Sequence, residues 1–392
     1  MSGFQVSQIG SKGTRFLRTS VALPIFLAVI LSGCAAPQPA APNGASAAPT
    51  TASASDATPA ASEAGSDVDL SGVKSYLLEK TSALKAASNE VKAHADAYYE
   101  LAKAANFDYN ALWSSEVATV TQSISDTRAA WMAASPLYEQ MEGIVGGTPS
   151  LSSYDVILDA GPSAAQDPEN AVPFDLNLPD GRVLPKPGNL FGVTESTLWG
   201  TFPEFQVADF KADWNGDGTI EFGENLPDPN VLKAGADALA SYAAELDSAA
   251  QAWEPTASDA FTSLVVMVPT MTELFESWRD SRFVSGDKST QRDFVVVSRL
   301  SDISDILGSI EVIYSGVQPL VQTVDADQAT QIGTDLTALR TFVQGIYTQE
   351  EGGKHYTPED ADLLGTEAQD RATAITGRVS QVAAQLGVKI EE

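Results

Sequence analysis

The stretch VKSYLLEKTSALKAASNEVKAHADAYYEL, residues 73–101, decides the fold class. Its apolar side chains recur at steps of three and four residues, which is the period of one face of an α-helix of about thirty residues. The apolar positions are Val73, Leu77, Leu84, Ala87, Val91, Ala95, Tyr98 and Leu101. The pattern predicts a long amphipathic helix that buries one stripe against other helices.

A second stripe of the same period runs from Leu112 to Ile144 and ends at the glycine pair 146–147, which is typical of a helix C-terminus. Two long helices joined by a short turn predict an antiparallel pair within a bundle. Further helical periodicity is found at about residues 231–250, 257–283, 294–317, 328–347 and 357–386. We therefore expect an all-α fold of two tandem helical bundles of the four-helix type, the first at residues 67–147 and the second at 228–392.

The helical pattern stops between the two bundles, where residues 148–227 form an irregular insertion. Residues 174–184 alternate between apolar and polar side chains around Asp180-Gly181, which predicts a short β-hairpin. A brief apolar segment, residues 190–199, follows the hairpin. Long irregular segments inside compact domains commonly carry function or bound ions, so we expect functional residues in this insertion.

The insertion ends in DWNGDGTIEFGE, residues 213–224, which has the pattern of an EF-hand calcium loop. The expected oxygen donors are Asp213, Asn215, Asp217, Thr219, Glu221 and Glu224. Gly218 stands at the sixth position, where the sharp turn favours a positive φ. Because Pro227 and Pro229 delay the next helix to about Val231 and the loop has no paired partner, we expect structural rather than regulatory calcium. An acidic surface turn without an ion is the alternative.

The N-terminus has the features of a bacterial lipoprotein signal over residues 1–33. Three basic residues precede an apolar run, residues 21–31, that is short for a membrane span. The Leu-Ser-Gly-Cys that ends at Cys34 resembles a lipobox, so we expect lipid on Cys34 and a lipid membrane as its partner. Residues 34–66 are almost wholly Ala, Pro, Ser and Thr and predict a disordered tether. The expected location is the periplasmic or extracellular face of a bacterial envelope, and an ordinary secretory signal is the alternative.

The acidic composition limits the partners and the chemistry. The chain has 52 acidic and 23 basic residues and a formal net charge of −29. A field of this sign repels nucleic acid and attracts cations, so no nucleic-acid partner is expected. The only histidines are His94 and His355, and the single cysteine is the expected lipid site, so the ligands and nucleophiles of common hydrolases are missing. We expect no enzymatic activity.

Two further stretches carry a family resemblance. Residues 129–142, AAWMAASPLYEQME, predict a helix that ends in an aromatic residue and a glutamate, and residues 191–200 read FGVTESTLWG. With the lipoprotein signal and the two bundles, they resemble the imelysin-like family, which includes EfeO/EfeM-type periplasmic iron-uptake lipoproteins and was once classed among metallopeptidases. The family's signature is a GxHxxE motif followed by a Leu-Trp pair. Aligned on that pair, Glu195 takes the place of the glutamate and Gly192 that of the histidine, which is absent.

The resemblance implies a second cation site. Without the histidine, Glu195 together with Glu142 and either Asp155 or Asp159 would form an all-oxygen site suited to ferric iron, manganese or calcium. A Glu195 that caps a helix or forms a salt bridge inside the bundle is the alternative. The leading hypothesis is a lipid-anchored metal-binding protein of iron uptake, with a membrane iron-uptake permease as partner. A cell-surface interaction module with only structural calcium and a degenerate metallopeptidase are the other hypotheses.

Overall fold

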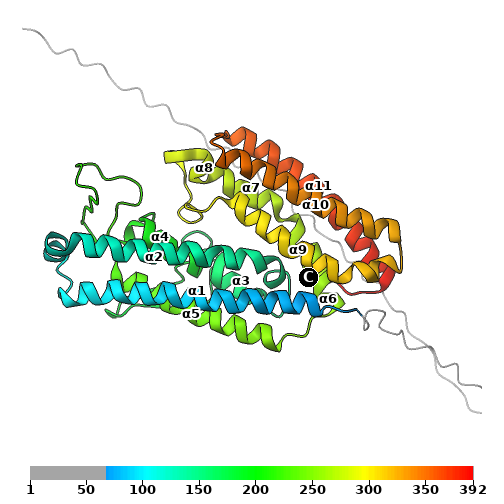
Figure 1. Cartoon of the computed structure of the whole chain (residues 1–392), viewed down its shortest axis with the longest axis horizontal. Helices are drawn as coiled ribbons and strands as arrows, with labels where there is room; N and C mark the ends of the chain where they lie inside the picture. Colours follow the sequence, from blue (N-terminus) through cyan, green and yellow to red (C-terminus); the bar gives the residue numbers. More distant parts are fainter. Residues whose placement is uncertain (1–67, 392) are drawn as a thin grey trace, which may run out of the picture. The chain divides into compact units, whose positions relative to one another are not determined.

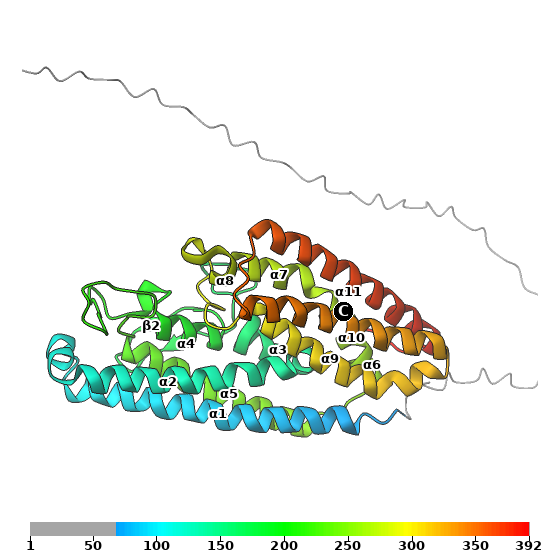
Figure 2. The ribbon, with the colours of Figure 1, turned by 45° about the horizontal axis from the view of Figure 1, so that its top comes forward.

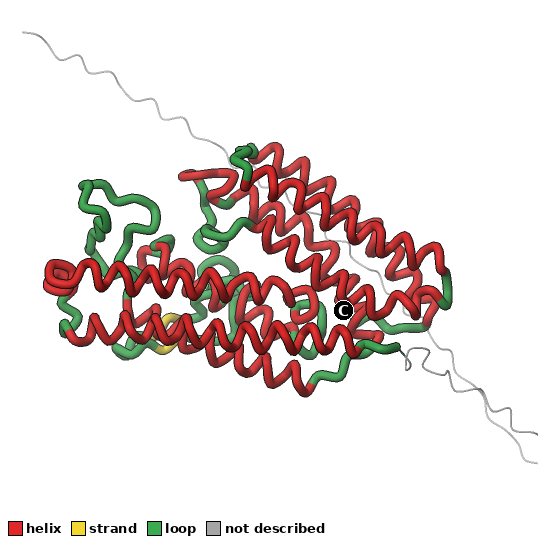
Figure 3. The backbone as a smooth tube through the Cα atoms, viewed as in Figure 1, coloured by secondary structure: helices red, strands yellow, loops and turns green. Residues whose placement is uncertain are grey.

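The computed structural model describes residues 68–391. The expected signal peptide, Cys34 and the tether lie outside these residues. The described part consists of helices, connecting loops and one two-stranded hairpin, as Figure 3 shows, which confirms the all-α fold class. Within residues 68–391, no helix combines the length and the apolar character needed to cross a bilayer.

Three long helices lie side by side in the first half of the described chain: α1 (Ser71–Ala104), α2 (Tyr109–Val145) and α5 (Pro229–Ala252). Figure 1 shows α1 lying along both α2 and α5. The predicted apolar stripe of α1 is its buried face, which includes Val73, Leu77, Leu84, Val91, Ala95 and Tyr98. The 3.6-residue period of the sequence is thus the physical reason why α1 packs against two neighbours at once.

The position of α5 differs from the sequence expectation, which grouped residues 228–252 with the second bundle. α5 packs along α1, and ion pairs join the two helices at Lys85–Asp247, Lys92–Asp237 and Lys233–Asp96. The helix also begins earlier than expected, at Pro229, because proline is tolerated in the first helical turn and the Asp228 side chain caps that turn.

The insertion between α2 and α5 contains short elements. They are α3 (Ser152–Asp155), a π-helical turn η1 (Val156–Ala160), β1 (Leu176–Asn177), β2 (Val183–Leu184), α4 (Leu190–Trp199) and a 3-10 turn η2 (Pro203–Phe205). The two strands form the predicted antiparallel hairpin. α4 begins at the capping side chain of Asn189, which accepts the N–H of Gly192 at 2.6 Å, and ends at Gly200, where φ is +76°.

The remaining helices pack on one another in the C-terminal half, where Figure 2 shows α9, α10 and α11 as neighbours. The elements of this half are α6 (Ala257–Met267), η3 (Val268–Thr270), α7 (Met271–Asp280), α8 (Arg282–Ser285), η4 (Gly286–Lys288), α9 (Arg299–Gln322), α10 (Ala326–Glu351) and α11 (Pro358–Leu386). The helical pattern predicted over residues 257–283 is interrupted at Pro269 by the 3-10 turn η3. α9 begins at Arg299 rather than at residue 294 because Phe294 has φ of +52°, which no helix accepts.

α2 and α9 approach each other closely at Gly143. A Cβ atom at this position would lie 2.4 Å from Ser309 Oγ and 2.9 Å from Ile310 Cδ1, so only glycine fits without displacement. Because Glu142 precedes Gly143 directly, this contact brings the end of α2 against α9. The acidic residues of α2 therefore lie beside charged residues of α9, where the candidate site is found.

Candidate metal site

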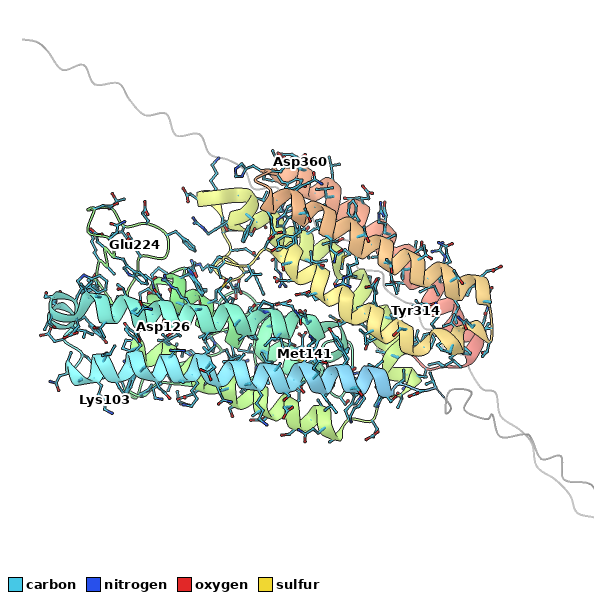
Figure 4. All side chains as sticks on the ribbon, viewed as in Figure 1. Lys103, Asp126, Met141, Glu224, Tyr314 and Asp360 are labelled. Carbon is cyan, nitrogen blue, oxygen red and sulfur yellow. The ribbon has the colours of Figure 1, made fainter. Side chains whose placement is uncertain are left out.

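Three carboxylates converge inside the helical core. Glu139 and Glu142 lie one turn apart near the end of α2, a part of the helix that Met141 marks in Figure 4, and Asp159 comes from the π-helical turn η1. Each offers an oxygen, and these oxygens all lie within 4.8 Å of one another. The side chains are almost inaccessible, with 1%, 6% and 2% of the residue surface exposed. In the described part of the chain, no other trio of Asp, Glu, His or Cys side chains meets this distance.

The local structure explains how Asp159 reaches this position. Residues 156–160 form a π turn, a rare geometry that is often found at functional sites. The turn is closed by Gly161, whose N–H bonds the carbonyl of Val156 at 3.0 Å. A Cβ atom on Gly161 would lie 2.1 Å from that carbonyl oxygen, so the closure requires glycine. The π turn thus directs Asp159 toward the carboxylates of α2.

One cation of the chain itself lies in the cluster. Nη1 of Arg299, on the first turn of α9, donates to Oδ2 of Asp302 at 3.0 Å. The same Nη1 lies 3.9 Å from Oε2 of Glu139 and 3.9 Å from Oδ2 of Asp159, which exceeds hydrogen-bonding distance. The ring of Phe294 covers the guanidinium at 3.7 Å from its centroid. Arg299 is therefore paired with Asp302 and only electrostatically close to the other two.

Three oxygens of the cluster have no hydrogen-bond partner within residues 68–391: Glu139 Oε2, Glu142 Oε2 and Asp159 Oδ2. Nε of Arg299 is unpartnered as well. A buried polar atom without a partner costs about 1–3 kcal/mol, and buried charges are normally paired or bound to metal. Converging orphaned oxygens are the donor set of a hard cation, so the residues present fit a bound metal ion.

The electrostatics of the cluster lead to the same conclusion. Burial raises the pKa of Glu139 and Glu142 well above the usual value, and it raises the pKa of Asp159 to about 7 and that of Asp302 to about 6. The charge of Arg299 opposes each of these increases. One guanidinium cannot neutralise all of these carboxylates. Either protons or a bound cation must supply the remaining positive charge.

Asp155 lies at the margin of the cluster. Its Oδ1 accepts the hydroxyl of Tyr138 at 2.7 Å, and burial raises the pKa of Asp155 to about 6. The negative charge of Asp155 in turn raises the pKa of Glu142. The structure thus brings together Glu142, Asp155 and Asp159 of the expected second site, with Asp155 held by tyrosine outside the closest trio.

Glu195 has a different position. Its carboxylate is 1% exposed and accepts three backbone N–H groups, from Phe294 at 2.6 Å, Val295 at 2.9 Å and Val296 at 3.1 Å. Burial and the charge of Asp293 raise the pKa of Glu195 to about 8, and the backbone donors oppose this. The structure does not bring Glu195 into the trio. It fastens the segment before α9 and caps no helix, since the N-cap of α9 is Ser298.

Loop 213–224 has the internal hydrogen bonds of a tight acidic turn. Asp213 accepts the N–H of Gly216 at 2.6 Å and that of Gly218 at 2.8 Å, and Gly218 has the expected positive φ of +89°. Glu224, labelled in Figure 4, accepts the N–H of Trp214 at 3.2 Å and that of Glu221 at 3.0 Å. The donors are all oxygens, so the residue types fit calcium. No helix leads directly into the loop, since α4 ends at Trp199 and only the turn η2 intervenes.

Arg128 of α2 fixes the end of this loop. Its guanidinium donates to the carbonyls of Leu198 at 2.6 Å and Gly223 at 2.5 Å. It also lies 4.4 Å from the ring centroid of Trp214 and 5.3 Å from that of Trp199. Burial lowers the pKa of Arg128 to about 10. The loop is thus attached to α2 and α4 by a cation–π stack and by charge-assisted hydrogen bonds.

Sequence analysis did not select Glu139, Asp293, Arg299 or Asp302 as site residues. The pairs Glu139/Glu142 and Arg299/Asp302 have helical i, i+3 spacing, which is visible in the sequence. In a chain with 52 acidic residues this spacing recurs on solvated helix faces, so it does not distinguish a site. The informative signal was the family resemblance, which implied Glu195 with Glu142 and either Asp155 or Asp159, and of these the structure places only Glu195 elsewhere.

The chain matches a known protein family over most of its described length. A family model described as imelysin, which is classed among peptidases, matches residues 73–386. The match covers both halves of the helical structure and every residue of the carboxylate cluster. No curated protein matches the chain.

Proposed function

Because the chain belongs to the imelysin family, which is extracytoplasmic, we propose that it is a lipid-anchored protein that binds a hard metal cation for uptake, with iron as the cargo. The observation that carries this proposal is the trio of orphaned oxygens on Glu139, Glu142 and Asp159. Three converging carboxylates provide the charge and the oxygen donors that ferric iron or manganese prefers.

The residues of the site have distinct parts in this proposal. Glu139, Glu142 and Asp159 are the ligands. Asp155 and Asp302 add negative charge, and Arg299 offsets part of it when no metal is bound. A bound cation then replaces the protons on the raised carboxylates, because metal ligands must be deprotonated. The site has no nitrogen or sulfur donor among these residues, which favours hard cations over zinc or copper.

Three further parts of the proposal concern the rest of the chain. Lipid on Cys34 would attach the protein to the membrane, where a membrane iron-uptake permease would receive the cargo. Calcium in loop 213–224 would stabilise the insertion, through the oxygens of the predicted donors. We propose no peptidase activity, because the trio lacks the histidine ligands of the common zinc hydrolases.

Metal content of the purified mature protein tests the proposal. After incubation with ferric iron, manganese or calcium and removal of the excess, mass spectrometry should find one hard cation in addition to the calcium of the loop. Glu142→Gln should weaken that binding by at least about tenfold, since even outer ligands cost this much. Glu116→Gln is the matched control, because Glu116 is exposed on the same helix and bonds only to Thr119.

The variants separate this function from the alternative. Asp213→Asn should remove calcium and leave the second cation in place. If the wild type binds no cation beyond the loop, or if Glu142→Gln binds as much as wild type, the uptake function is wrong. A surface interaction module with only structural calcium would then be the better description.

A further inference from the structure

The three ligands are too deeply buried for a hydrated cation to reach them directly, since each is at most 6% exposed. Two partly exposed carboxylates lie at the margin of the cluster, Asp155 and Asp293. Asp155 is held in place by the hydroxyl of Tyr138. Asp155 and Asp293 are thus partly exposed carboxylates beside the buried trio, and each is a candidate for the first contact of an entering cation.

Asp293 is free to bind. Within residues 68–391 no other residue donates a hydrogen bond to its carboxylate, which has only its own backbone as a partner. The carboxylate faces α4 at Gly192, where a Cβ atom would lie 3.2 Å from Oδ2 and 3.3 Å from the Asp293 Cβ. Gly192 is the position at which the GxHxxE motif has its histidine. In this chain the space is occupied by Oδ1 of Asn189, 3.0 Å from that Cβ position, and by the aspartate from another segment.

The charge of Asp293 acts on the cluster. Its negative charge raises the pKa of Asp159 and of Glu195, and the charge of Arg299 lowers the pKa of Asp293 itself. Asp293 is therefore partly exposed and at the same time electrostatically coupled to the buried trio. A cation bound there would already interact with Asp159.

The segment that carries Asp293 is an irregular connection that few contacts hold in place. Residues 289–298 have no regular secondary structure between η4 and α9. They are held by Glu195, which bonds three consecutive N–H groups, and by the hydroxyl of Thr201, which donates to the carbonyl of Arg292. Phe294 has φ of +52° and covers the Arg299 guanidinium. Release of the contacts at Glu195 would free Phe294 and so uncover the Arg299 guanidinium, which lies 3.9 Å from Glu139 and from Asp159.

We propose that Asp293 is the entrance ligand of the buried site, which captures a hydrated hard cation and passes it to Glu139, Glu142 and Asp159 when segment 289–298 swings aside. This inference rests on the proposed function. In this inference Asp293 affects the association rate, because a carboxylate at the entrance of a site raises the rate of cation binding by electrostatic attraction. Glu195 is a positioning residue that keeps the segment closed.

Association kinetics of terbium(III) test the inference. Terbium is a hard trivalent cation, and an Asp213→Asn background keeps the calcium loop silent. In stopped-flow luminescence of the full chain, Asp293→Asn should lower the association rate about tenfold with one terbium still bound at saturation. Asp287→Asn is the matched control, since Asp287 is in the preceding turn and its side chain is 97% exposed. Asp155→Asn tests the other route.

The outcomes are distinct. Equal association rates for Asp293→Asn and Asp287→Asn, or a slower rate in Asp155→Asn alone, would overturn the inference and leave the binding function intact. If the parent protein binds no terbium, the proposed function itself fails.

Hydrogen exchange of the amides of residues 294–296 provides a readout that needs no metal. Glu195→Gln should exchange these amides faster and bind terbium faster than the parent protein. Unchanged exchange together with an unchanged association rate in Glu195→Gln would contradict the movement of the segment. Wild-type exchange in the rest of Asp293→Asn would show that this variant is folded.

Discussion

The two acidic groups of this chain are built in opposite ways. In loop 213–224, the oxygens of Asp213 and Glu224 accept backbone N–H groups, and most of the loop is exposed. In the buried cluster, Glu139, Glu142 and Asp159 each keep an oxygen without a partner. The loop is therefore satisfied without an ion, whereas the cluster is not. A bound cation would add stability to the loop. In the cluster it would remove the free-energy cost of buried oxygens that have no hydrogen-bond partner.

The largest expected effect comes from removing the only cation inside the cluster. Arg299→Met should destabilise the metal-free protein by about 3–5 kcal/mol, because it leaves buried carboxylates without their counter-ion. Urea unfolding measures this. Arg282→Met is the control, since Arg282 pairs with the exposed Asp287 and should cost less than about 1 kcal/mol.

A saturating hard cation should restore part of the stability of Arg299→Met, because the cation replaces the missing positive charge. If Arg299→Met and Arg282→Met unfold at the same urea concentration, the cluster is not electrostatically strained. The loop and the buried cluster would then not differ in their effect on the stability of the metal-free protein.

The difference between the groups also explains what the sequence could show. Loop 213–224 uses donors within twelve positions, so its pattern is visible in the chain itself. The cluster joins α2, the turn η1 and the first turn of α9, and Glu139 and Arg299 are brought together only by the close approach of α2 and α9 at Gly143. The apolar periodicity predicted that α2 and α9 are helices. It did not predict that these two helices pack against each other.

Glu195 is a second residue whose contacts could not be predicted from the local sequence. The family resemblance predicted Glu195 as a ligand of a cation site, whereas its carboxylate is 1% exposed and accepts three backbone N–H groups. Its partners are backbone groups about a hundred positions later, which no local pattern encodes. The α9 boundary was misplaced because Phe294 has φ of +52°, a backbone conformation that the apolar pattern does not reveal.

An intermediate effect is expected from pH. The folded pKa of Asp155 is about 6 and that of Asp159 about 7, against 3.8 for the unfolded chain. Raised values mean that the protonated carboxyls favour the folded state, so this stability is complete below about pH 4 and is lost as pH rises through 6 and 7. The two groups together should cost the metal-free protein about 4 kcal/mol of stability between pH 5 and pH 8.

Thermal unfolding at fixed ionic strength measures this loss, and the protein saturated with a hard cation should show the opposite trend because the cation needs ionised ligands. Asp159→Asn removes one of the titrating groups and should flatten the metal-free profile. A metal-free protein equally stable at both pH values would show that the cluster is solvated in solution.

The smallest expected effect concerns the loop. Glu221 stands at the ninth position, which commonly binds calcium through a water, so Glu221→Gln should weaken calcium binding by about tenfold or less, whereas Glu224→Gln should weaken it more. Neither the backbone nor the core is touched at Glu221, which is exposed, so the calcium-free protein should unfold within about 0.5 kcal/mol of wild type. Calcium titration calorimetry measures the calcium affinity, and urea unfolding without calcium measures the stability of the calcium-free protein. A large calcium-free destabilisation would mean that the loop depends on its acidic side chains for folding, as the cluster does, and the contrast between the two groups would be lost.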